Sequence, residues 1–540
     1  MAVIFTISVF CQCVLFNYQA FNQVETNLSE CLGYYLPKLS IAAVVGGFAF
    51  LMKRKYWTVI VSLVLSVWII SNLIYFRSAG IVLDPYSFTM TGNMKGFWGS
   101  IVSYIYPTDI LILMPSLLVY AVYRIFAEKF KAGDRSFPGF VIFALLGLLL
   151  HIGCYFIKRG QREVPFNPFD KTFVGEGGFG WTSNSYVIGT SIIHGFIYSL
   201  INPVEADGET PVYSLSKSDE KLLSVFCRPE KMGEGTSSPV PTGRLIVILV
   251  ESLESWAVSP TVMPNICHFI ETHADNCLMA DKIRRQTAGG VSGDGQMIVN
   301  TGLLPVMEGA ACFRFPRNAY PSISSLFKSS AIFFPGSKSV WNQGAMDEAY
   351  GIKYEYGFDQ RKFSGRTNPR MDETIISSLC DNFEKYQYIL ALTYASHAPF
   401  RKYSRKSSAD TDSAMPETMR NYLNCLHYTD SCMGVFLSLV DKDFTLKNST
   451  IVITGDHPVF DRDRVSEFNR YLNKSGAEYE ITEGNTALII YSSEIKEKTY
   501  VSDQCYQMDI YPTVLNLIGC GGGIFGKVSA LICSIPRQKG

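Results

Sequence analysis

The sequence predicts an N-terminal polytopic α-helical membrane domain followed by an α/β domain whose mainly parallel sheet is covered by helices. Two observations support this class. Residues 1–160 contain only six acidic side chains, whereas strand-like aliphatic runs alternate with helical patterns from residue 244 onward. At 540 residues the chain is also too long for one ordinary domain. We therefore expect a five-span transmembrane domain over 1–157, a connector over 158–243, and an extracytoplasmic α/β domain over 244–540.

Five segments are candidates for membrane spans. Trp57–Tyr75 and Phe137–Ile157 run 19 and 21 residues without Asp, Glu, Lys or Arg, and a bilayer core needs roughly 20 apolar residues per helix. Ala2–Phe21, Leu36–Met52 and Ile110–Tyr123 are weaker, and each could instead be a buried or interfacial helix. The first candidate lacks a basic n-region and a small-residue cleavage site, so we interpret it as a retained span.

Basic residues in the short loops predict the orientation. One cluster follows the second candidate span (Lys53, Arg54 and Lys55), and another follows the fourth (Arg124, Lys129, Lys131 and Arg135). Cytoplasmic placement of both clusters puts the N-terminus inside and everything after Ile157 outside the cytoplasmic (inner) membrane. Lys158, Arg159 and Arg162 then lie outside, which is a weaker violation than the opposite topology requires.

The charge balance argues against one class of partner, and the cysteine positions do not decide whether disulfides form. The chain has 48 basic and 48 acidic residues, and nucleic-acid binders normally show a basic excess, so we expect no nucleic acid as a partner. Ten of the fourteen cysteines lie after residue 200. Cys267 with Cys277, or Cys425 with Cys432, could pair in an oxidising exterior, although buried free thiols explain them equally well.

The connector and the α/β domain differ in pattern. The connector has a glycine-rich stretch, Val174–Trp181, and a potential membrane-proximal helix, Ser183–Ser199. The later strand-like runs are Leu245–Val250, Tyr388–Tyr394, Thr450–Thr454 and Ala487–Tyr491. Helical patterns lie between them at Met263–His273, Gly293–Thr301, Asp372–Tyr386 and Pro416–Val440. This alternation indicates a mainly parallel sheet, in which ligands bind beyond the carboxyl ends of the strands.

Polar residues follow three of these strands. Glu251 follows the first, His397 the second, and Asp456 with His457 the third. Carboxylates, an imidazole and a hydroxyl could together hold one divalent ion such as Zn²⁺ or Mn²⁺, with Mg²⁺ as a further candidate. Each residue alone is a weak signal, because single histidines are more often structural.

A glycine-rich loop could supply a nucleophile. Gln286–Gln296 reads QTAGGVSGDGQ and leads into a helical stretch, so Ser292 would stand near a helix N-terminus. Backbone N–H groups and the helix dipole favour negative charge there. A flexible Gly/Ser turn is the alternative interpretation.

Six motifs in order resemble those of the lipoteichoic acid synthase family, in the sulfatase-like branch of the alkaline phosphatase superfamily. They are Val250–Ser252 (VES), QTAGGVSGDGQ, Val340–Gln343 (VWNQ), Ser396–Phe400 (SHAPF), Gly455–Phe460 (GDHPVF) and Asp509–Gly519 (DIYPTVLNLIG). The resemblance extends over nearly the whole chain. It implies a sulfatase-like fold, one bound divalent ion and a covalent phospho-enzyme intermediate.

The resemblance also implies roles for individual residues. Glu251, Asp456 and His457 would be metal ligands, and Ser292 would be both nucleophile and ligand. His397 would contact the phosphoryl group or protonate the leaving oxygen. Two further residues would contact the substrate headgroup (Trp341 and Gln343).

The sequence departs from the family at several positions. Ser292 stands where Thr is usual, and a usual Thr-Ser-Asp-Ser-Glu run becomes Ser-Gly-Asp-Gly-Gln over Ser292–Gln296, which we expect to loosen the loop. Pro335 replaces a common His and Gln343 a common Arg, so a bidentate phosphate contact is lost. The resemblance therefore leaves open whether the substrates are the standard glycerol phosphate donor and acceptor. The formylglycine motif of true sulfatases is absent after Ser292, which argues against sulfate ester hydrolysis.

Three functional hypotheses follow. The first is transfer of a phosphoglycerol- or phosphoethanolamine-type group from a phospholipid to an extracytoplasmic glycan or lipid acceptor, through a phospho-Ser292 intermediate. The second is hydrolysis at the same site, by a phosphodiesterase or sulfatase-like hydrolase. The third is a catalytically inactive, membrane-bound binding protein, which would lack a tightly bound divalent ion.

Overall fold

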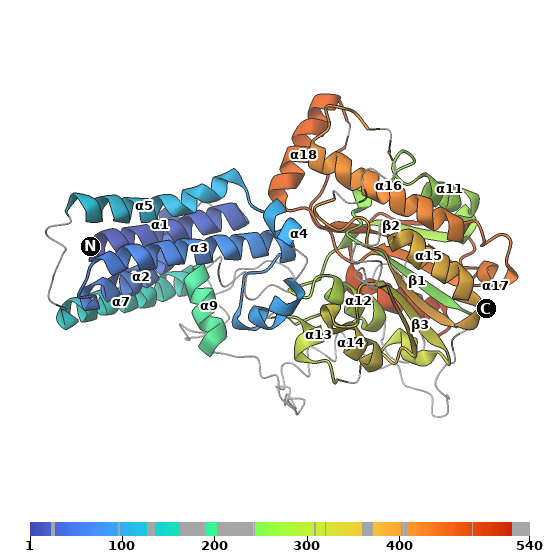
Figure 1. Cartoon of the computed structure of the whole chain (residues 1–540), viewed down its shortest axis with the longest axis horizontal. Coiled ribbons are helices and arrows are strands. Elements are labelled where there is room, and N and C mark those ends of the chain that lie inside the picture. The colour runs from blue at the N-terminus through green and yellow to red at the C-terminus, as the bar shows by residue number, and fades with distance from the viewer. Residues whose placement is uncertain are drawn as a thin grey trace. The chain divides into compact units, whose positions relative to one another are not determined.

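The computed structural model describes most of the chain as two compact units (Figure 1). The residues described are 1–22, 28–94, 98–126, 135–161, 187, 190–201, 241, 243–306, 309–318, 320–358, 371–400, 403, 408–409, 411–477 and 479–520. The first unit comprises Met1–Thr91, Ser100–Glu205 and Met307–Gly309, and the second comprises Gly92–Gly99, Ala206–Val306 and Ala310–Gly540. The glycine-rich stretch Val174–Trp181 lies outside the described residues. The domain boundaries expected at residues 157 and 243 therefore stay predictions.

In the described part of the first unit, five helices are long and apolar enough to cross a membrane. They are α1 (Ala2–Phe21), α2 (Leu28–Leu51), α3 (Tyr56–Ala79), α5 (Ile110–Ile125) and α7 (Phe137–Gln161). All five predicted spans are thus present as helices. Shorter elements accompany them: η1 (Pro85–Met94), α4 (Trp98–Ser103), η2 (Pro107–Asp109) and α9 (Ile192–Ile201).

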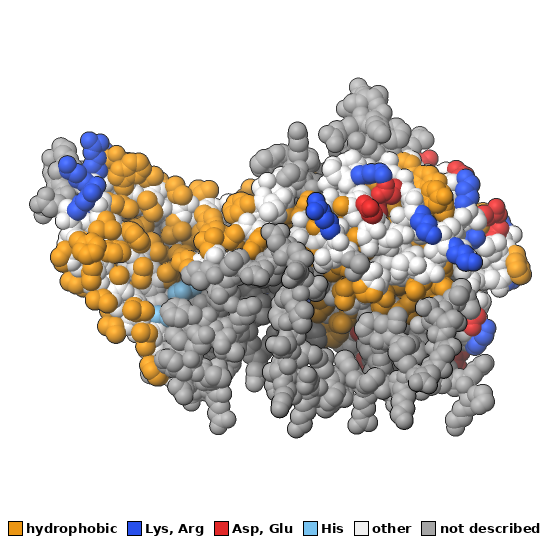
Figure 2. Space-filling view, turned by 90° about the horizontal axis from the view of Figure 1, so that it is seen from below, with side chains coloured by type: hydrophobic (Ala, Val, Ile, Leu, Met, Phe, Trp, Pro, Cys, Tyr) orange, Lys and Arg blue, Asp and Glu red, His pale blue; other side chains and the backbone are white. Residues whose placement is uncertain are grey.

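Hydrogen bonds between side chains join the helices of this unit. Gln12 of α1 donates from Nε2 to the hydroxyls of Ser66 on α3 and Ser116 on α5, each at 2.8 Å. Such polar contacts join helices where lipid provides no hydrophobic driving force between them. Figure 2 shows hydrophobic side chains over much of the face of this unit that it draws, as expected for a lipid-facing surface. Exposed hydrophobic residues of these helices include Val64, Leu118 and Leu149.

Helix α9 occupies part of the predicted membrane-proximal helix. It begins at Ile192, later than the expected start at Ser183, and residues 183–186 and 188–189 lie outside the described part. The side chain of Asn17 in α1 donates to the Val187 carbonyl at 3.2 Å. Val187 and Ile192 are both buried against the first unit, so this segment packs with the membrane helices.

The second unit contains a nine-stranded, mainly parallel sheet with the order β4-β3-β5-β1-β6-β7-β2-β8, and β9 pairs with β2. Its strands are β1 (Leu245–Val250), β2 (Cys277–Arg284), β3 (Ser330–Pro335), β4 (Tyr354–Phe358), β5 (Tyr388–Leu392), β6 (Thr450–Gly455), β7 (Asn485–Tyr491), β8 (Thr499–Val501) and β9 (Cys505–Tyr506). Strand β7 alone is antiparallel, to both β6 and β2. The predicted parallel sheet is therefore confirmed, with this reversal on one side.

Helices cover the sheet (Figure 1). The longer ones are α11 (Pro264–Thr272), α12 (Ser292–Thr301), α15 (Met371–Asn382), α16 (Glu417–Leu437), α18 (Arg462–Ser475) and α19 (Ile510–Leu517). Shorter turns are η4 (Ser255–Ala257), η5 (Ala274–Asn276), α13 (Ala311–Arg314), η6 (Ile323–Leu326), η7 (Val340–Asn342), α14 (Gln343–Ala349), η9 (Phe383–Lys385), α17 (Phe444–Lys447) and η10 (Gln507–Asp509). Alternate residues of β1, among them Ile246 and Ile248, belong to a core that includes Ile375 of α15 and Leu426 of α16. Helices α15 and α16 therefore cover one face of the sheet. The carboxyl ends of the strands remain as the place where a ligand can bind.

Candidate active site

The carboxyl ends of β1 and β6 bring three predicted ligands together. The two strands are parallel neighbours with Val250 opposite Gly455, so Glu251 and Asp456 leave the sheet side by side. One ligand atom from each of Glu251, Asp456 and His457 lies within 4.8 Å of the others, and all three residues are buried. The Nε2 atom of His457 lies 3.6 Å from Oε1 of Glu251 and 3.5 Å from Oδ2 of Asp456.

The donor set suits a divalent cation. The Nδ1 atom of His457 lies 3.0 Å from the Pro458 carbonyl, which can only accept, so Nδ1 carries the proton and Nε2 presents a lone pair to the cluster. Burial, and then the neighbouring Asp456 carboxylate, raise the pKa of Glu251 to about 8. Two buried carboxylates facing each other are stabilised as anions when a cation lies between them. The residues present therefore fit a metal site.

Ser292 adjoins this cluster. Its Oγ atom lies 3.2 Å from Nε2 of His457, at the first residue of α12. The preceding residue, Val291, has φ 41° and ψ −108°, a strained conformation for a β-branched residue that turns the chain sharply into the helix. The N–H groups of Gly293 and Asp294 both lie within hydrogen-bonding distance of the Gly290 carbonyl, at 2.7 and 3.3 Å. These two N–H groups are therefore bonded within the loop, whereas we expected backbone N–H groups to favour negative charge at Ser292. Of the two expected contributions, the helix dipole remains.

The glycines of this loop serve close packing, which corrects the expectation of a loosened loop. A Cβ on Gly295 would lie 2.4 Å from the Asp456 carbonyl oxygen, and one on Gly290 would lie 2.1 Å from Oδ1 of Asp294. The buried Asp294 carboxylate accepts hydrogen bonds from the N–H groups of Ala288 and Gly290 at 2.8 and 2.9 Å. The loop is thus pinned against the metal-ligand segment.

A backbone bend after β1 orients Glu251. Ser252 has φ 54°, and its N–H donates to Oδ1 of Asp456 while its hydroxyl donates to Oε1 of Glu251, both at 2.8 Å. The N–H of Glu251 donates to the Thr393 hydroxyl at 3.0 Å. Both candidate carboxylate ligands are therefore held by Ser252, an arrangement typical of metal sites.

His397 lies on the loop after β5. The strand ends at Leu392, earlier than the predicted Tyr394, because the next residues turn to meet Asp372. The buried Asp372 carboxylate accepts hydrogen bonds from the N–H groups of Tyr394 and Ala395 at 2.8 and 3.1 Å. The His397 ring stacks on Tyr394 with centroids 5.3 Å apart, and its Nδ1 lies 2.7 Å from the Ala398 carbonyl.

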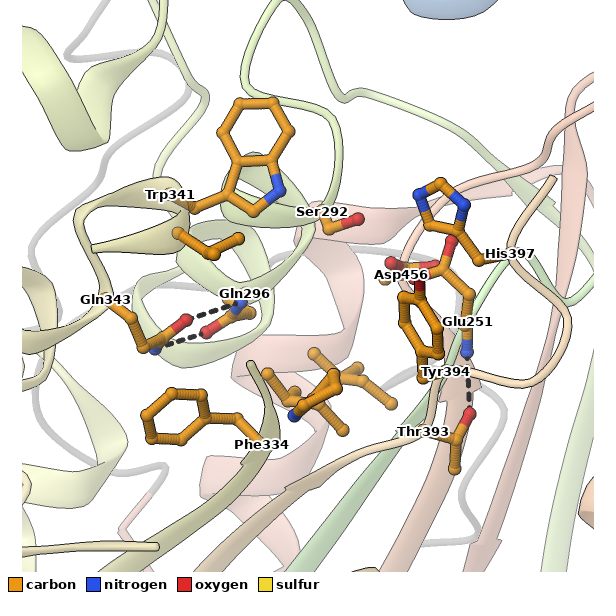
Figure 3. Close-up of a pocket in the computed structure, with 14 residues that line it drawn as sticks. Glu251, Ser292, Gln296, Phe334, Trp341, Gln343, Thr393, Tyr394, His397 and Asp456 are labelled. Carbon is orange, nitrogen blue, oxygen red and sulfur yellow. Dashed lines mark hydrogen bonds between the residues drawn. The ribbon is translucent and has the colours of Figure 1, made fainter. Parts of the chain in front are cut away.

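A pocket joins these groups to the predicted headgroup residues (Figure 3). Trp341 and Gln343 line it, as do Ser292 and His397. Figure 3 shows Gln296 and Gln343 on one side of Ser292, and Glu251, Asp456 and His397 on the other. The remaining lining residues are Leu249, Phe334, Pro335, Val340, Leu392, Thr393 and Tyr394. Six of the seven predicted site residues line this pocket, and His457 lies beside it in the acidic cluster.

Two buried polar residues at this site, Gln507 and Asp372, were not singled out from the sequence, and a third, Gln296, was noted only as a departure from the family loop. Gln507 donates to the Asp456 carbonyl and accepts from the N–H of Gln286, both at 2.8 Å. Asp372 holds the His397 loop, and Gln296 pairs with Gln343. A single sequence does not indicate the roles of these side chains, because each hydrogen-bonds to a residue far away in the chain. The proximity of Gln507 to the DIYPTVLNLIG motif was the available hint.

The cysteines suggested as disulfide pairs are free thiols. Cys267, Cys277, Cys425 and Cys432 all lack a disulfide in the structure. Cys425 and Cys432 both lie on α16, where seven residues span roughly 10 Å along the axis, beyond the Cα separation that a disulfide tolerates.

Each of the two parts of the chain matches a known protein domain. Residues 1–174 match the lipoteichoic acid synthase N-terminal domain, and residues 296–520 match the sulfatase domain. The second match begins after Glu251 and Ser292. Lipoteichoic acid synthase 2 of Bacillus subtilis is 20% identical over 527 residues, covering 92% of this chain and 78% of that protein.

Two further proteins are similar over most of the chain. The lipoteichoic acid synthase-like protein YvgJ of Bacillus subtilis is 22% identical over 536 residues, with 92% of this chain and 81% of that protein covered. The solved integral membrane protein lipooligosaccharide phosphoethanolamine transferase A from Neisseria meningitidis is 12% identical with a TM-score of 0.51, covering 96% of this chain and 95% of that one. This last likeness shows that the fold is shared.

Proposed function

We propose that this chain, which belongs to the lipoteichoic acid synthase-like group in the sulfatase-like branch of the alkaline phosphatase superfamily, transfers a phospho-group from a phospholipid to an acceptor in the cell envelope. The transferred group is of the phosphoglycerol or phosphoethanolamine type. The acceptor is a glycan or lipid on the outer side of the cytoplasmic membrane. The names of the similar proteins, lipoteichoic acid synthases and a phosphoethanolamine transferase, support this reaction class.

One observation carries the proposal. The Ser292 hydroxyl lies 3.2 Å from Nε2 of His457, and this nitrogen belongs to a buried cluster that fits a divalent cation. A hydroxyl at this position faces the same pocket as His397 and Trp341. Nucleophile, charge-stabilising cluster and acid–base group therefore surround one cavity, as phosphoryl transfer requires.

The cation would be held by Glu251, Asp456 and His457, with the Ser292 hydroxyl next to it. When bound, it would withdraw charge from the phosphoryl oxygens and lower the pKa of the adjacent hydroxyl. Mixed carboxylate and imidazole ligands favour Mn²⁺ or Zn²⁺ over Mg²⁺, which prefers oxygen ligands and retains several waters.

The reaction has two steps in which this chain's residues make and break bonds. In the first, Ser292 Oγ bonds to phosphorus as the bond to the diacylglycerol oxygen breaks; the hydroxyl proton passes to solvent, and His397 gives a proton to the leaving oxygen. Diacylglycerol and phospho-Ser292 result. In the second, the acceptor hydroxyl oxygen attacks phosphorus and gives its proton to His397, while the Oγ–P bond breaks and Ser292 Oγ takes a proton from solvent.

Membrane attachment fits a lipid donor. The five apolar helices make the chain a multi-pass membrane protein. Lys53, Arg54 and Lys55 lie in the turn between α2 and α3, and we place this turn in the cytoplasm, so that the catalytic unit lies outside. This arrangement keeps the site on the side where envelope acceptors occur.

Substitution of the nucleophile tests the proposal. We expect Ser292→Ala in the full-length protein to lower headgroup release from labelled phosphatidylglycerol or phosphatidylethanolamine by roughly 10³-fold or more. Ser431→Ala, at an exposed hydroxyl on α16, serves as the control. Wild-type protein should also acquire label that remains attached after denaturation. Headgroup release unchanged in the Ser292 variant would refute the assignment.

Products separate transfer from hydrolysis. Adding an envelope glycan or glycolipid acceptor should shift the label from water-soluble monoester to acceptor. If the monoester remains the sole product with every acceptor, the protein is a hydrolase.

A further inference from the structure

Tyr394 lies beside the candidate acid–base group on the loop after β5 (Figure 3). Its ring stacks on the His397 imidazole, with centroids 5.3 Å apart and an interplanar angle of 26°. Both side chains line the pocket that contains Ser292. A phenol ring therefore covers one face of the imidazole inside the candidate active site.

Two of the helices that cover the sheet hold the backbone of Tyr394. Its N–H donates to Oδ1 of Asp372 on α15 at 2.8 Å. The other oxygen of this carboxylate accepts a hydrogen bond from the hydroxyl of Thr429 on α16 at 2.7 Å. Asp372 and Thr429 are both fully buried, so these hydrogen bonds are shielded from water and tie Tyr394 to the helical layer.

Aromatic packing holds the ring of Tyr394 as well. The ring meets Tyr403 edge-on, with centroids 6.4 Å apart and an interplanar angle of 87°. Tyr403 is buried and stacks in turn on Tyr428 of α16, with centroids 5.5 Å apart. Aromatic pairs favour edge-to-face and offset-stacked arrangements at such separations. The ring that contacts His397 is therefore anchored to the protein core.

Two contacts fix the orientation of the His397 imidazole. Its Nδ1 lies 2.7 Å from the Ala398 carbonyl, which can only accept, so Nδ1 keeps its proton and proton exchange takes place at Nε2. The Tyr394 ring fixes the plane of the imidazole, because two flat rings in face contact resist rotation of either one. The hydrogen bond and the stack together aim Nε2 in one direction, as a proton donor requires.

We propose that Tyr394 is a positioning residue, which holds the His397 imidazole in the orientation that protonates the leaving oxygen. The inference rests on the proposed function, in which His397 is this acid. In that step the bond from phosphorus to the diacylglycerol oxygen breaks, the bonding electron pair stays on the oxygen, and His397 Nε2 supplies the proton. Loss of the Tyr394 ring should therefore slow reactions that need this proton and spare reactions that do not.

The choice of leaving group tests this role. Full-length protein in detergent with Mn²⁺ is assayed with phosphatidylglycerol or phosphatidylethanolamine, and with the p-nitrophenyl phosphodiester of the same headgroup. Diacylglycerol is a poor leaving group unless its oxygen is protonated, whereas p-nitrophenolate leaves without a proton. We expect Tyr394→Leu to lower kcat on the lipid by roughly 10–100-fold, because acid–base catalysis contributes on the order of 10²–10⁴-fold and a misoriented acid loses part of it. On the p-nitrophenyl phosphodiester the loss should stay below about 3-fold.

Two further variants separate positioning from general damage to the site. Tyr394→Phe keeps the ring and should recover most of the rate that Tyr394→Leu loses on the lipid. His397→Gln removes the proton donor, so adding Tyr394→Leu to it should lower the rate no further, because residues that act as a unit have non-additive effects. Tyr479→Leu, at an exposed tyrosine of the same unit, is the control.

The dependence on leaving group separates this inference from the proposed function. A loss confined to the lipid and recovered by Tyr394→Phe supports the inference. Three results would overturn it: no loss on the lipid or equal losses on both substrates in Tyr394→Leu, a further loss in the double variant, or Tyr394→Phe as slow as Tyr394→Leu. Headgroup release that does not depend on Ser292 would instead contradict the proposed function. If Tyr394→Leu fails to fold, Tyr394→Met makes the same comparison, because methionine adapts to an irregular gap.

Discussion

The Oγ atom of Ser292 lies 3.2 Å from the Nε2 atom of His457. These residues come from different segments, the start of α12 and the loop directly after β6, and are separated by 165 positions in sequence. Because Nδ1 of His457 is tied to the Pro458 carbonyl, the nitrogen facing Ser292 is the one free to bind a cation. The candidate nucleophile and the candidate metal site therefore share one point in space.

Loss of this imidazole should abolish stabilisation by metal. For wild-type protein, a divalent ion at 100 times its Kd should add about 2.7 kcal/mol to the free energy of unfolding. We expect His457→Ala to lose most of the corresponding rise in unfolding temperature on adding Mn²⁺ or Zn²⁺. His268→Ala, at an exposed position of α11, is the matched control. An equal metal-induced rise in both variants would show that the cation binds elsewhere.

Two glycines on α12 should differ in their tolerance of alanine. A Cβ on Gly295 would lie 2.4 Å from the Asp456 carbonyl, whereas one on Gly293 would have its nearest contact at 3.5 Å, with Cys312 Sγ. Alanine favours a helix over glycine by about 1 kcal/mol, but overpacking costs roughly 1–3 kcal/mol. We expect Gly295→Ala to lower the unfolding temperature and metal content, and Gly293→Ala to keep both. Denaturation followed by circular dichroism, with metal analysis, would measure this contrast; equal behaviour of the two variants would contradict it.

The strands that the sequence predicted (β1, β5, β6 and β7) are almost entirely buried, although β3, which has five of its six residues buried, was missed. All six residues of β1 and of β6 are buried, so each appears as a continuous aliphatic run. Strand β2 was missed because it lies near one side of the sheet and mixes four buried residues with the exposed Lys282 and Arg284. Its pattern resembles a surface segment until its pairing with β7 is known.

The candidate metal ligands could be predicted from the sequence, but the residues that hold those ligands in position could not. Glu251, Asp456 and His457 could be identified because they directly follow strands, and strand ends converge. Gln507 could not, because its role depends on contacts with residues 51 and 221 positions away. The close packing near Ser292 was not predictable for a similar reason: Gly295 lies against the carbonyl of Asp456, directly after β6, and the sequence does not reveal this neighbour.

Glu254 should make the stability of the protein depend on pH. Burial raises its pKa to about 7, from an ordinary value of 4.5. Because the folded state holds this proton more tightly than the unfolded chain, the contribution to stability is complete below about pH 4.5 and is lost as pH rises through about 7. We expect the free energy of unfolding to fall by on the order of 3 kcal/mol across this window.

Glu254→Gln should flatten that profile. The amide does not titrate, and its oxygen can still accept the hydrogen bonds that Val459 and Phe460 donate to Oε1 at 2.9 and 2.8 Å. The measurement is the unfolding temperature between pH 4.5 and 8 with a chelator present, and Glu417→Gln at an exposed position is the control. Identical slopes in wild type and the Glu254 variant would rule out this carboxyl as the source.

Gln507 should couple the nucleophile loop to the metal-ligand segment. Its fully buried side chain donates to the Asp456 carbonyl and accepts from the N–H of Gln286, where the loop leading to Ser292 begins. Gln507→Leu leaves both backbone groups unpaired in the interior, which should cost roughly 3 kcal/mol of stability. It should also weaken metal binding by roughly 10–100-fold, as loss of a ligand's supporting hydrogen bond does.

Gln504→Leu, at an exposed glutamine on the same segment, should change neither. Because lost stability alone could lower metal content, affinity is measured by titration at a temperature where both variants remain folded. Unchanged affinity there would show that Asp456 keeps its position without Gln507.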